Sequence, residues 1–390
     1  MLLTRTATTT PRPAVRRTLG RALVGVLAVT LAVSAWVVVP ALSAPGNDDL
    51  PARVAESARD RGLGFVVTGL ETLQYQLSPP PEKGSLDPAA VTSLAAAGTG
   101  PSPLPTGAER PAHDVGRQLD IAPLAAPALP GEGVFTTRVS VDGQPALQTA
   151  QLRPDAVHTS FLAGVAWMSS SLLRFVQHPG ATDPGRLGQW QQPATVPTTG
   201  RAGLAATFNS GFKIADSRGA YYQDGATIGR FRAGTASLVI YRDGHADIGA
   251  WGREVTMTPD VVSVRQNLSL LVDGGRLNPT ADTSSQSDWG ATIGSAAYVW
   301  RSGIGVTARG DLVFVMGDAL SAGSLGNLLQ RAGAVRAMQL DINRSWVSFM
   351  WYSPGPAVGT ATPHKLIDFS RPADRYFTVN NRDFFAVYTR

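Results

Sequence analysis

The segment FTTRVSVDG, residues 135–143, decides the fold class. Its aromatic and β-branched residues alternate with polar ones, and Asp-Gly favours the tight turn of a β-hairpin. Two further segments, Ser237–Tyr241 and Gly305–Thr307, lead through glycine-containing turns into second strand-like segments. We therefore expect a domain of mixed or antiparallel sheets.

One clear helix is expected among these strands, over about Ser324–Ala332, with Ser324 as its N-cap. Val335–Leu340 then has the composition of a buried strand, and Asp341 follows it directly. Many strands with few helices are typical of an α+β fold. We place this domain at residues 134–390.

An uncharged apolar segment, residues 22–42, precedes the domain. About 20 such residues are long enough to cross a hydrocarbon core of roughly 30 Å. The arginines of the basic tail, residues 1–21, favour a cytoplasmic N-terminus. A cleaved signal peptide is the alternative to a retained anchor, although its apolar region usually covers only about 7–15 residues. Both interpretations predict an extracytoplasmic domain, and retention predicts a single-pass protein of the cell membrane.

Two kinds of segment join the anchor to the domain within residues 43–133. Leucines and valines at helical spacing over residues 53–77 predict a short amphipathic stalk helix. From about Ser78 to Gly131 the composition shifts to Pro, Ala, Gly and Ser. Such a composition forms little core, which predicts mainly an extended spacer.

Charge and motif content exclude several functions. The 34 basic and 29 acidic residues give a net charge of +5, but five arginines precede the apolar segment, so the remainder balances at 34 − 5 = 29 against 29. We therefore expect no nucleic-acid partner. The absence of cysteine excludes thiolate zinc sites, thiol nucleophiles and disulfides. The five histidines do not cluster, no GxSxG, HExxH or GxxxxGK[ST] motif occurs, and no metal site is predicted.

Three polar segments accompany the predicted strands. FNSGFK, residues 208–213, places an amide, a hydroxyl and a cation in one turn after an apolar strand. RSGIGV, residues 301–306, begins with an arginine. LDINRSW, residues 340–346, presents a carboxylate, an amide, a guanidinium and a hydroxyl after a buried strand, where ligand groups are often displayed. Taken singly, each also fits an ordinary polar turn or an edge arginine.

Together and in this order, the three segments resemble the phosphodiester glycosidase family. This group includes the enzyme that exposes mannose 6-phosphate by removing a covering N-acetylglucosamine. The family pattern runs N-G-G-F-F, then R-x-x-[IV]-G, then a helix and L-D-G-G-G-S, and the resemblance covers residues 134–390. Ser210 and Lys213 depart from the first motif, and residues 342–344 replace a glycine run that would let backbone approach a ligand closely. These departures indicate a divergent branch.

The resemblance implies hydrolysis that releases a sugar from a sugar-1-phosphodiester, with a carbohydrate or sugar-phosphate as substrate. Catalytic roles would fall on Asp341, Arg301 and Asn209, because such a reaction needs a carboxyl group at an oxocarbenium-like centre and a cation for the phosphate. Substrate binding would fall on Arg344, Asn343, Ser345, Lys213, Ser210 and Gly211. Weaker candidates for a second carboxylate are Asp224, Asp273 and Asp318.

A different class of function stays open. The altered glycine run and the long spacer also suit a non-catalytic polysaccharide-binding protein of the cell envelope on the same fold. Trp346 and Tyr222 are candidates either for stacking on a sugar or for packing in the core. The sequence requires no cofactor and leaves a divalent cation, the sugar and its aglycone undetermined.

Overall fold

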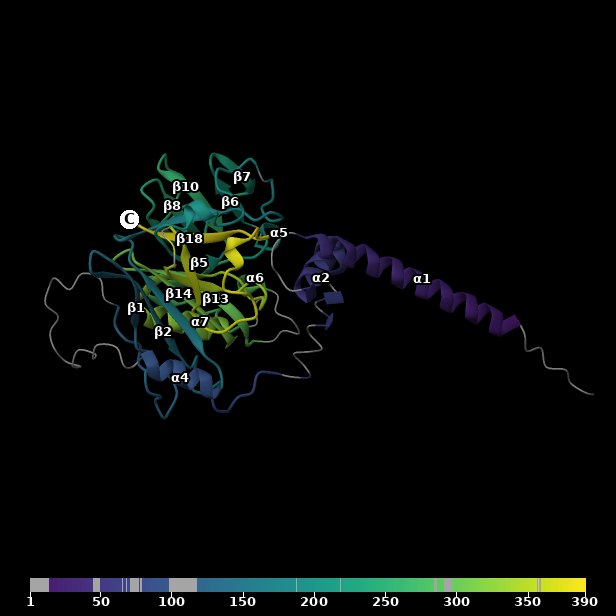
Figure 1. Ribbon diagram of the computed structural model, residues 1–390, viewed down its shortest axis with the longest axis horizontal. Coiled ribbons are helices and arrows are strands. Elements are labelled where there is room, and N and C mark those ends of the chain that lie inside the picture. Colours follow the sequence, from purple (N-terminus) through teal and green to yellow (C-terminus); the bar gives the residue numbers. More distant parts are fainter. Residues whose placement is uncertain are drawn as a thin grey trace, which may run out of the picture. The chain divides into compact units, whose positions relative to one another are not determined.

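The computed structural model describes residues 14–44, 50–64, 66–67, 69–70, 77, 79–97, 118–186, 188–217, 219–283, 286–290, 297–355, 357 and 359–390. The chain divides into two compact units (Figure 1), the first with residues 1–44 and 49–67 and the second with residues 45–48 and 68–390. The apolar helix belongs to the first unit, and all candidate site residues belong to the second.

The first unit contains α1 (Ala14–Ser43), α2 (Leu50–Ala58) and the π-helical turn η1 (Arg59–Leu63). Within α1, Val24–Ser43 is long and apolar enough to cross a membrane. The C-terminal part of α1 packs on α2, where Ser57 Oγ donates to the carbonyl of Val37 at 2.7 Å. An apolar helix in this position fits a membrane anchor or a signal sequence. Of the range 53–77 in which a stalk helix is expected, residues 65, 68 and 71–76 lie outside the described part.

The second unit is built from three sheets, and every pairing between the described strands is antiparallel. The first sheet has eight strands in the order β1 (Thr136–Val141), β2 (Gln144–Leu152), β3 (Ala163–Met168), β14 (Leu312–Leu320), β13 (Val299–Thr307), β15 (Ala334–Gln339), β11 (Leu270–Asp273) and β12 (Arg276–Leu277). The second has the order β7 (Ala226–Gly229), β6 (Ala220–Gln223), β10 (Val261–Gln266), β8 (Ala236–Tyr241) and β9 (Ala246–Ala250). The third has the order β17 (Ala361–Lys365), β16 (Phe349–Pro354), β5 (Leu204–Asn209), β18 (Phe384–Thr389) and β4 (Leu173–His178).

Short helices complete this unit: α4 (Pro88–Ala97), α5 (Ile214–Ser217), α6 (Gln286–Trp289), α7 (Ala322–Arg331), and the 3-10 turns η2 (Thr198–Gly200) and η4 (Arg375–Phe377). The expected α+β class with antiparallel sheets is thus confirmed. The three predicted hairpins are present as β1–β2, β8–β9 and β13–β14.

The eight-stranded sheet is buried on both faces. In β14, Leu312, Phe314 and Met316 enter one apolar cluster, whereas Val313 and Val315 enter another. Alternate strand residues point to opposite faces, so one face packs on the β5 sheet and the other on α7. Phe314 marks the first interface, with its ring centroid 5.3 Å from that of Phe208 in β5. The packing between these sheets brings the end of β5 next to β13.

The predicted helix near residue 324 is α7, but its cap lies one turn earlier. Ser321 is the N-cap: its hydroxyl accepts from the Ser324 amide, and the Ser324 hydroxyl accepts from the Ser321 amide, both at 2.9 Å. This reciprocal capping box makes Ser324 the third helical residue. A serine at either position satisfies the residue preference for an N-cap, so the prediction from the sequence put the N-cap three residues too late.

The described part of the interval with spacer-like composition contains structured contacts, whereas residues 78 and 98–117 of the predicted spacer lie outside the described part. Helix α4 contacts β2, and the amide of Ile121 donates to the carbonyl of Gly133 at 2.9 Å. Glu132 forms an ion pair with Arg153 at 2.7 Å. Composition alone did not reveal these contacts, because a few well-placed side chains suffice to dock a segment. The domain boundary at residue 134 stays a prediction.

Candidate functional site

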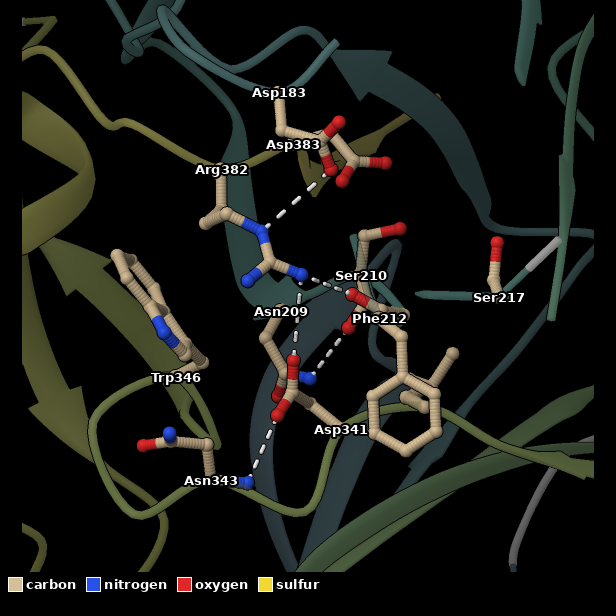
Figure 2. A network of polar contacts seen from close by, with 12 residues as sticks. Asp183, Asn209, Ser210, Phe212, Ser217, Asp341, Asn343, Trp346, Arg382 and Asp383 are labelled. Carbon is tan, nitrogen blue, oxygen red and sulfur yellow. Dashed lines mark hydrogen bonds and ion pairs between the residues drawn. The ribbon is translucent and has the colours of Figure 1, made fainter. Parts of the chain in front are cut away.

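Two of the predicted motifs meet at one serine hydroxyl. Asn209, the last residue of β5, donates from Nδ2 to Ser302 Oγ at 2.9 Å. The backbone amide of Asp341, just after β15, donates to the same hydroxyl at 3.2 Å. All three residues are buried, and Asn209 and Asp341 lie together in Figure 2. Ser302 of β13 therefore joins the first and third motifs.

Asn209 holds three segments together. Besides Ser302, its Nδ2 binds the carbonyl of Ser210 at 2.7 Å, and its Oδ1 accepts from the Ser348 amide at 2.9 Å. Both amide protons of the side chain are thus engaged within the protein. This geometry makes Asn209 a positioning residue for the loop at residues 210–213.

Asp341 is held on both carboxylate oxygens. Its Oδ1 accepts from the Asn343 amide at 2.8 Å, and its Oδ2 lies 3.6 Å from Nη2 of Arg382. The same Nη2 donates to the carbonyl of Gly211 at 3.0 Å. Arg382 therefore connects the carboxylate that follows β15 with the loop that follows β5 (Figure 2).

A second carboxylate contacts the same guanidinium. Asp183 Oδ2 lies 3.7 Å from Nε of Arg382 and accepts from the Ile214 amide at 3.1 Å. Burial raises the pKa of Asp183, the charges of Arg382 and Arg265 oppose this rise, and that of Asp383 adds to it. Arg382 consequently lies between Asp183 and Asp341, as Figure 2 shows.

A fully buried ion pair supports this network from behind. Arg265 Nε and Asp383 Oδ2 are 2.9 Å apart, and both side chains are 0% exposed. Arg265 also donates to the carbonyl of Phe212. The loop at residues 210–213 is therefore anchored by Arg382 and by Arg265, each through a backbone carbonyl. Charge-assisted bonds of this kind hold a buried turn rigidly.

Two small residues in this loop are tightly enclosed. A Cβ on Gly211 would lie 2.8 Å from Cγ of Asn267, whose Nδ2 binds the carbonyls of Gln339 and Leu340 at 2.8 Å each. Ser210 Oγ is buried and has no hydrogen-bond partner among the described residues. The site thus has room for glycine at position 211 and for nothing larger without a shift of Asn267.

Arg301 contacts residues of the two strands that flank β13. Its Nε donates to the carbonyl of Leu320 at 2.8 Å and its Nη1 to Gln339 Oε1 at 2.6 Å. Arg301 and Ser302 are neighbours on β13, so their side chains point to opposite faces. The structure thus brings Asn209 and Asp341 together at Ser302 and places Arg301 against Leu320 and Gln339, and convergence of these residues with Arg344 on one pocket stays a prediction. Arg382 occupies the guanidinium position beside Asp341 instead.

The remaining residues of the third motif form the adjoining turn. Asn343 Oδ1 accepts from the Ser345 amide at 2.8 Å, and Arg344 is exposed. In the first motif, Lys213 is half-buried, and its carbonyl accepts from the amide of Ser217 at 2.8 Å. Arg344 thus remains accessible at the edge of the turn.

Trp346 packs inside the protein. It is buried, and the guanidinium carbons of Arg371, Arg375 and Arg382 lie 5.3, 5.4 and 5.3 Å from its ring centroid. Cations placed over an indole are attracted by its ring electrons. Tyr222 of β6 packs near Phe231, with a centroid distance of 6.5 Å. The structure supports core packing for both aromatics, and the arginines make the surroundings of Asp341 positively charged.

The weaker carboxylate candidates divide into two groups. Asp318 in β14 is half-buried; burial raises its pKa, while the Ala319 amide and the charge of Arg344 oppose the rise. Asp224 accepts from the Gln191 amide at 2.8 Å, and Asp273 pairs with Arg253 at 2.7 Å on the surface. Asp318 has an electrostatic link to the third motif through Arg344. No three His, Asp or Glu residues within the described ranges are grouped to hold a metal ion.

Sequence reasoning missed the partners that complete the network. Ser302 lies inside a quoted motif but is one residue from the arginine that drew attention. Arg382 and Asp383 stand in the polar run NNRD, residues 380–383, directly before an apolar strand, and this is the same local signal as in the third motif. Asp183 precedes a proline and had the pattern of an ordinary turn.

Comparison with known proteins bears on this geometry. Residues 199–341 match the phosphodiester glycosidase family. The matched range contains Asn209, Ser302 and Asp341, so the resemblance noted in the sequence is confirmed there. The second unit carries a phosphodiester glycosidase-like domain, which suggests a hydrolase. No curated protein sequence matches the chain.

Solved structures with a similar course of the chain have low identity. The catalytic domain of zebrafish N-acetylglucosamine-1-phosphodiester alpha-N-acetylglucosaminidase, auto-inhibited by its pro-peptide, is 14% identical, with a TM-score of 0.41 over 66% of this chain and 88% of that one. A hypothetical protein from Synechocystis is 14% identical, with a TM-score of 0.35 over 68% and 65%. A putative exported protein from Burkholderia pseudomallei is 11% identical, with a TM-score of 0.31 over 60% and 75%.

Proposed function

We propose that the second unit is a hydrolase that releases a sugar from a sugar-1-phosphodiester. One observation carries this proposal: Asn209 and Asp341, from two separate motifs, meet at the Ser302 hydroxyl within the residues that match the family. A guanidinium, that of Arg382, lies beside the carboxylate. The proposal assigns Asp341 to the sugar and the surrounding cations to the phosphate.

The chemistry follows from these groups. Cleavage between an anomeric carbon and a phosphate oxygen develops positive charge on the sugar ring and negative charge on the leaving group. A carboxylate held in place, as Asp341 is by the Asn343 amide, can activate water or stabilise the ring. Arg382 and the exposed Arg344 supply positive charge for the departing phosphate.

We further propose that this reaction takes place outside the cytoplasm on a glycan of the cell envelope. The support is the apolar helix Val24–Ser43 and the basic residues that precede it. A retained helix would keep the hydrolase at the membrane surface. A carbohydrate substrate and membrane attachment are then the partners expected.

Replacement of Asp341 by Asn tests the catalytic proposal, because it keeps the shape and removes the charge. With full-length protein in detergent, sugar release from a uridine diphosphate sugar and from an alkyl sugar-1-phosphodiester should fall by at least about 100-fold. The melting temperature should change little, because Arg382 keeps Asp183 as a partner. The matched control is Asp368→Asn at a side chain that is 97% exposed, which should keep full activity.

Near-normal turnover by Asp341→Asn would refute the assigned role. A non-catalytic envelope-binding protein is the alternative, and one observation favours it. The Ile342 side chain, where the family has glycine, closes in on Gly290: a Cβ on that glycine would lie 3.4 Å from Ile342 Cδ1 and 2.7 Å from Phe212 Cζ. Binding of the sugar-1-phosphodiester without sugar release by the folded wild-type protein would establish this alternative.

A further inference from the structure

Asp183 is a second carboxylate at the same guanidinium as Asp341, and no motif pointed to it. Arg382 Nε lies 3.7 Å from Asp183 Oδ2, and Arg382 Nη2 lies 3.6 Å from Asp341 Oδ2. Because Nε and Nη2 belong to one planar guanidinium, the two carboxylates contact the same rigid group. Pairs of carboxyl groups at a short separation are the machinery that most glycosidases use.

The backbone fixes Asp183 against the segment that carries Arg382. The Asp183 amide donates to the carbonyl of Asn381 at 3.0 Å, and its carbonyl accepts from the Asp383 amide at 3.1 Å. Asp183 and Arg382 form an isolated parallel bridge. Asp183 therefore cannot move away from Arg382 without breaking backbone bonds on both sides, so the spacing of the two carboxylates is preorganised.

The two carboxylates have different surroundings. Asp341 Oδ1 accepts from the Asn343 amide, and its side chain is 4% exposed. Asp183 has an 18% exposed side chain, and its Oδ2 receives both the Ile214 amide and the contact with Arg382. Because the Ile214 amide and Arg382 both contact Oδ2, a proton on Asp183 would reside on Oδ1.

We propose, on the basis of the proposed function, that Asp183 donates a proton to the departing phosphate while Asp341 activates the attacking water. When two carboxyl groups have different environments, one commonly acts as the general acid and the other as the general base. The role of a second carboxyl group is thus assigned to Asp183 rather than to Asp224, Asp273 or Asp318.

The step balances in atoms and charge. The water oxygen bonds to the anomeric carbon, and one water proton passes to Asp341. The bond between the anomeric carbon and the bridging oxygen breaks, its electron pair stays on that oxygen, and the Oδ1 proton of Asp183 neutralises it. Solvent then removes the proton from Asp341 and returns one to Asp183, so that one water is consumed for each sugar and phosphate monoester released.

The groups around Asp183 act on its pKa in both directions. Arg382 and Arg265 act on it as cations, Asp383 acts on it as an anion, and the hydroxyl of Tyr221 is close enough to interact with it electrostatically. Burial is the largest influence and raises the pKa of Asp183. The leaving group is a phosphate monoester, whose second pKa is about 6. A carboxyl group with a raised pKa lies closer to this value than an ordinary aspartate does and is therefore the better proton donor to it.

The test uses full-length protein in detergent with two substrates of one sugar, an alkyl sugar-1-phosphodiester and the glycosyl fluoride. Fluoride leaves with little need of a proton. Asp183→Asn should lower kcat/KM on the phosphodiester by about 100-fold and keep hydrolysis of the fluoride within a few-fold of wild type. In wild type, kcat/KM on the phosphodiester should fall as the pH rises through the pKa of Asp183, and this alkaline limb should vanish in the variant.

Asp216→Asn, at an exposed position of α5, is the matched control and should behave as wild type. Equal losses on both substrates, or an unchanged alkaline limb in Asp183→Asn, would overturn the assignment while wild-type activity upholds the proposed function. If Asp183→Asn fails to fold, Asp183→Glu takes its place, and activity of that variant without an alkaline limb overturns the assignment. A folded wild-type protein that releases sugar from neither substrate refutes both proposals.

Discussion

Glu132 forms a buried ion pair with Arg153 that fastens residues 118–133 to the end of β2. Its Oε1 accepts from the amide and Nε of Arg153 at 2.9 Å each. Its Oε2 accepts from Nη2 of Arg153 at 2.7 Å and from the Leu129 amide at 3.0 Å. The two side chains are 0% and 6% exposed, so water screens this pair very little.

Replacement of Glu132 by Gln should therefore destabilise the second unit strongly. The variant leaves the Arg153 guanidinium buried without an opposing charge, and the new amide nitrogen cannot accept from the donors that surround it. Removing one partner of a buried pair costs about 3–5 kcal/mol. At about 2–4 °C per kcal/mol for domains of roughly this size, the melting temperature should fall by roughly 6–20 °C.

The loss of stability caused by Glu132→Gln should depend on pH. Burial by itself raises the pKa of Glu132, but the hydrogen bonds from Arg153 and the Leu129 amide outweigh it, and the pKa lies below its usual 4.5. A carboxylate with a lowered pKa stabilises the fold fully above its unfolded pKa, and this contribution disappears as the pH falls through the folded pKa. The difference between wild type and Glu132→Gln should accordingly shrink below about pH 4.5.

Thermal unfolding followed by circular dichroism, with Asp368→Asn as the exposed control, measures this effect. The control should melt as wild type does, because its side chain is 97% exposed. A Glu132→Gln variant that melts within about 2 °C of wild type at pH 7 would refute this reasoning. It would also show that residues 118–133 do not need this pair to dock.

Two other predictions concern the site and the topology. Gly211→Ala puts a Cβ 2.8 Å from Cγ of Asn267, so both the melting temperature and sugar release should fall, and an unchanged variant would mean that Asn267 yields freely. If α1 is retained, residues 134–390 should be cut by protease added to intact spheroplasts and should stay in the membrane fraction; a soluble chain beginning near Pro45 would show cleavage instead.

Local features of the structure could be predicted from the sequence. The turn at Asp142 and Gly143 has positive φ at both residues, 49° and 76°, which is the conformation that Asp-Gly favours in a two-residue hairpin. The apolar composition of residues 335–340 correctly indicated a strand, which is β15. The cap of α7 was missed because Ser321 and Ser324 are equivalent by type, and only their reciprocal hydrogen bonds distinguish them.

In the candidate site, too, only the residues within local motifs could be predicted from the sequence. Asn209 and Asp341 were found because each follows an apolar strand within a recognisable motif. Arg301 was found through its motif as well, yet its side chain lies on the other face of β13, and the sequence does not say which face of a doubly buried strand looks toward the loops. Ser302, the adjacent residue, makes the contact instead.

The sequence by itself determined the apolar helix, the antiparallel hairpins, the family resemblance and two of the residues at the candidate site. Each of these depends on residues a few positions apart, whose spacing fixes local conformation or a motif. The tertiary structure decided that Asp183, Asp341 and Arg382 form one network. Those residues come from three distant segments, and their contacts exist only because the sheets pack face to face, which brings the ends of strands together in a way that no local pattern encodes.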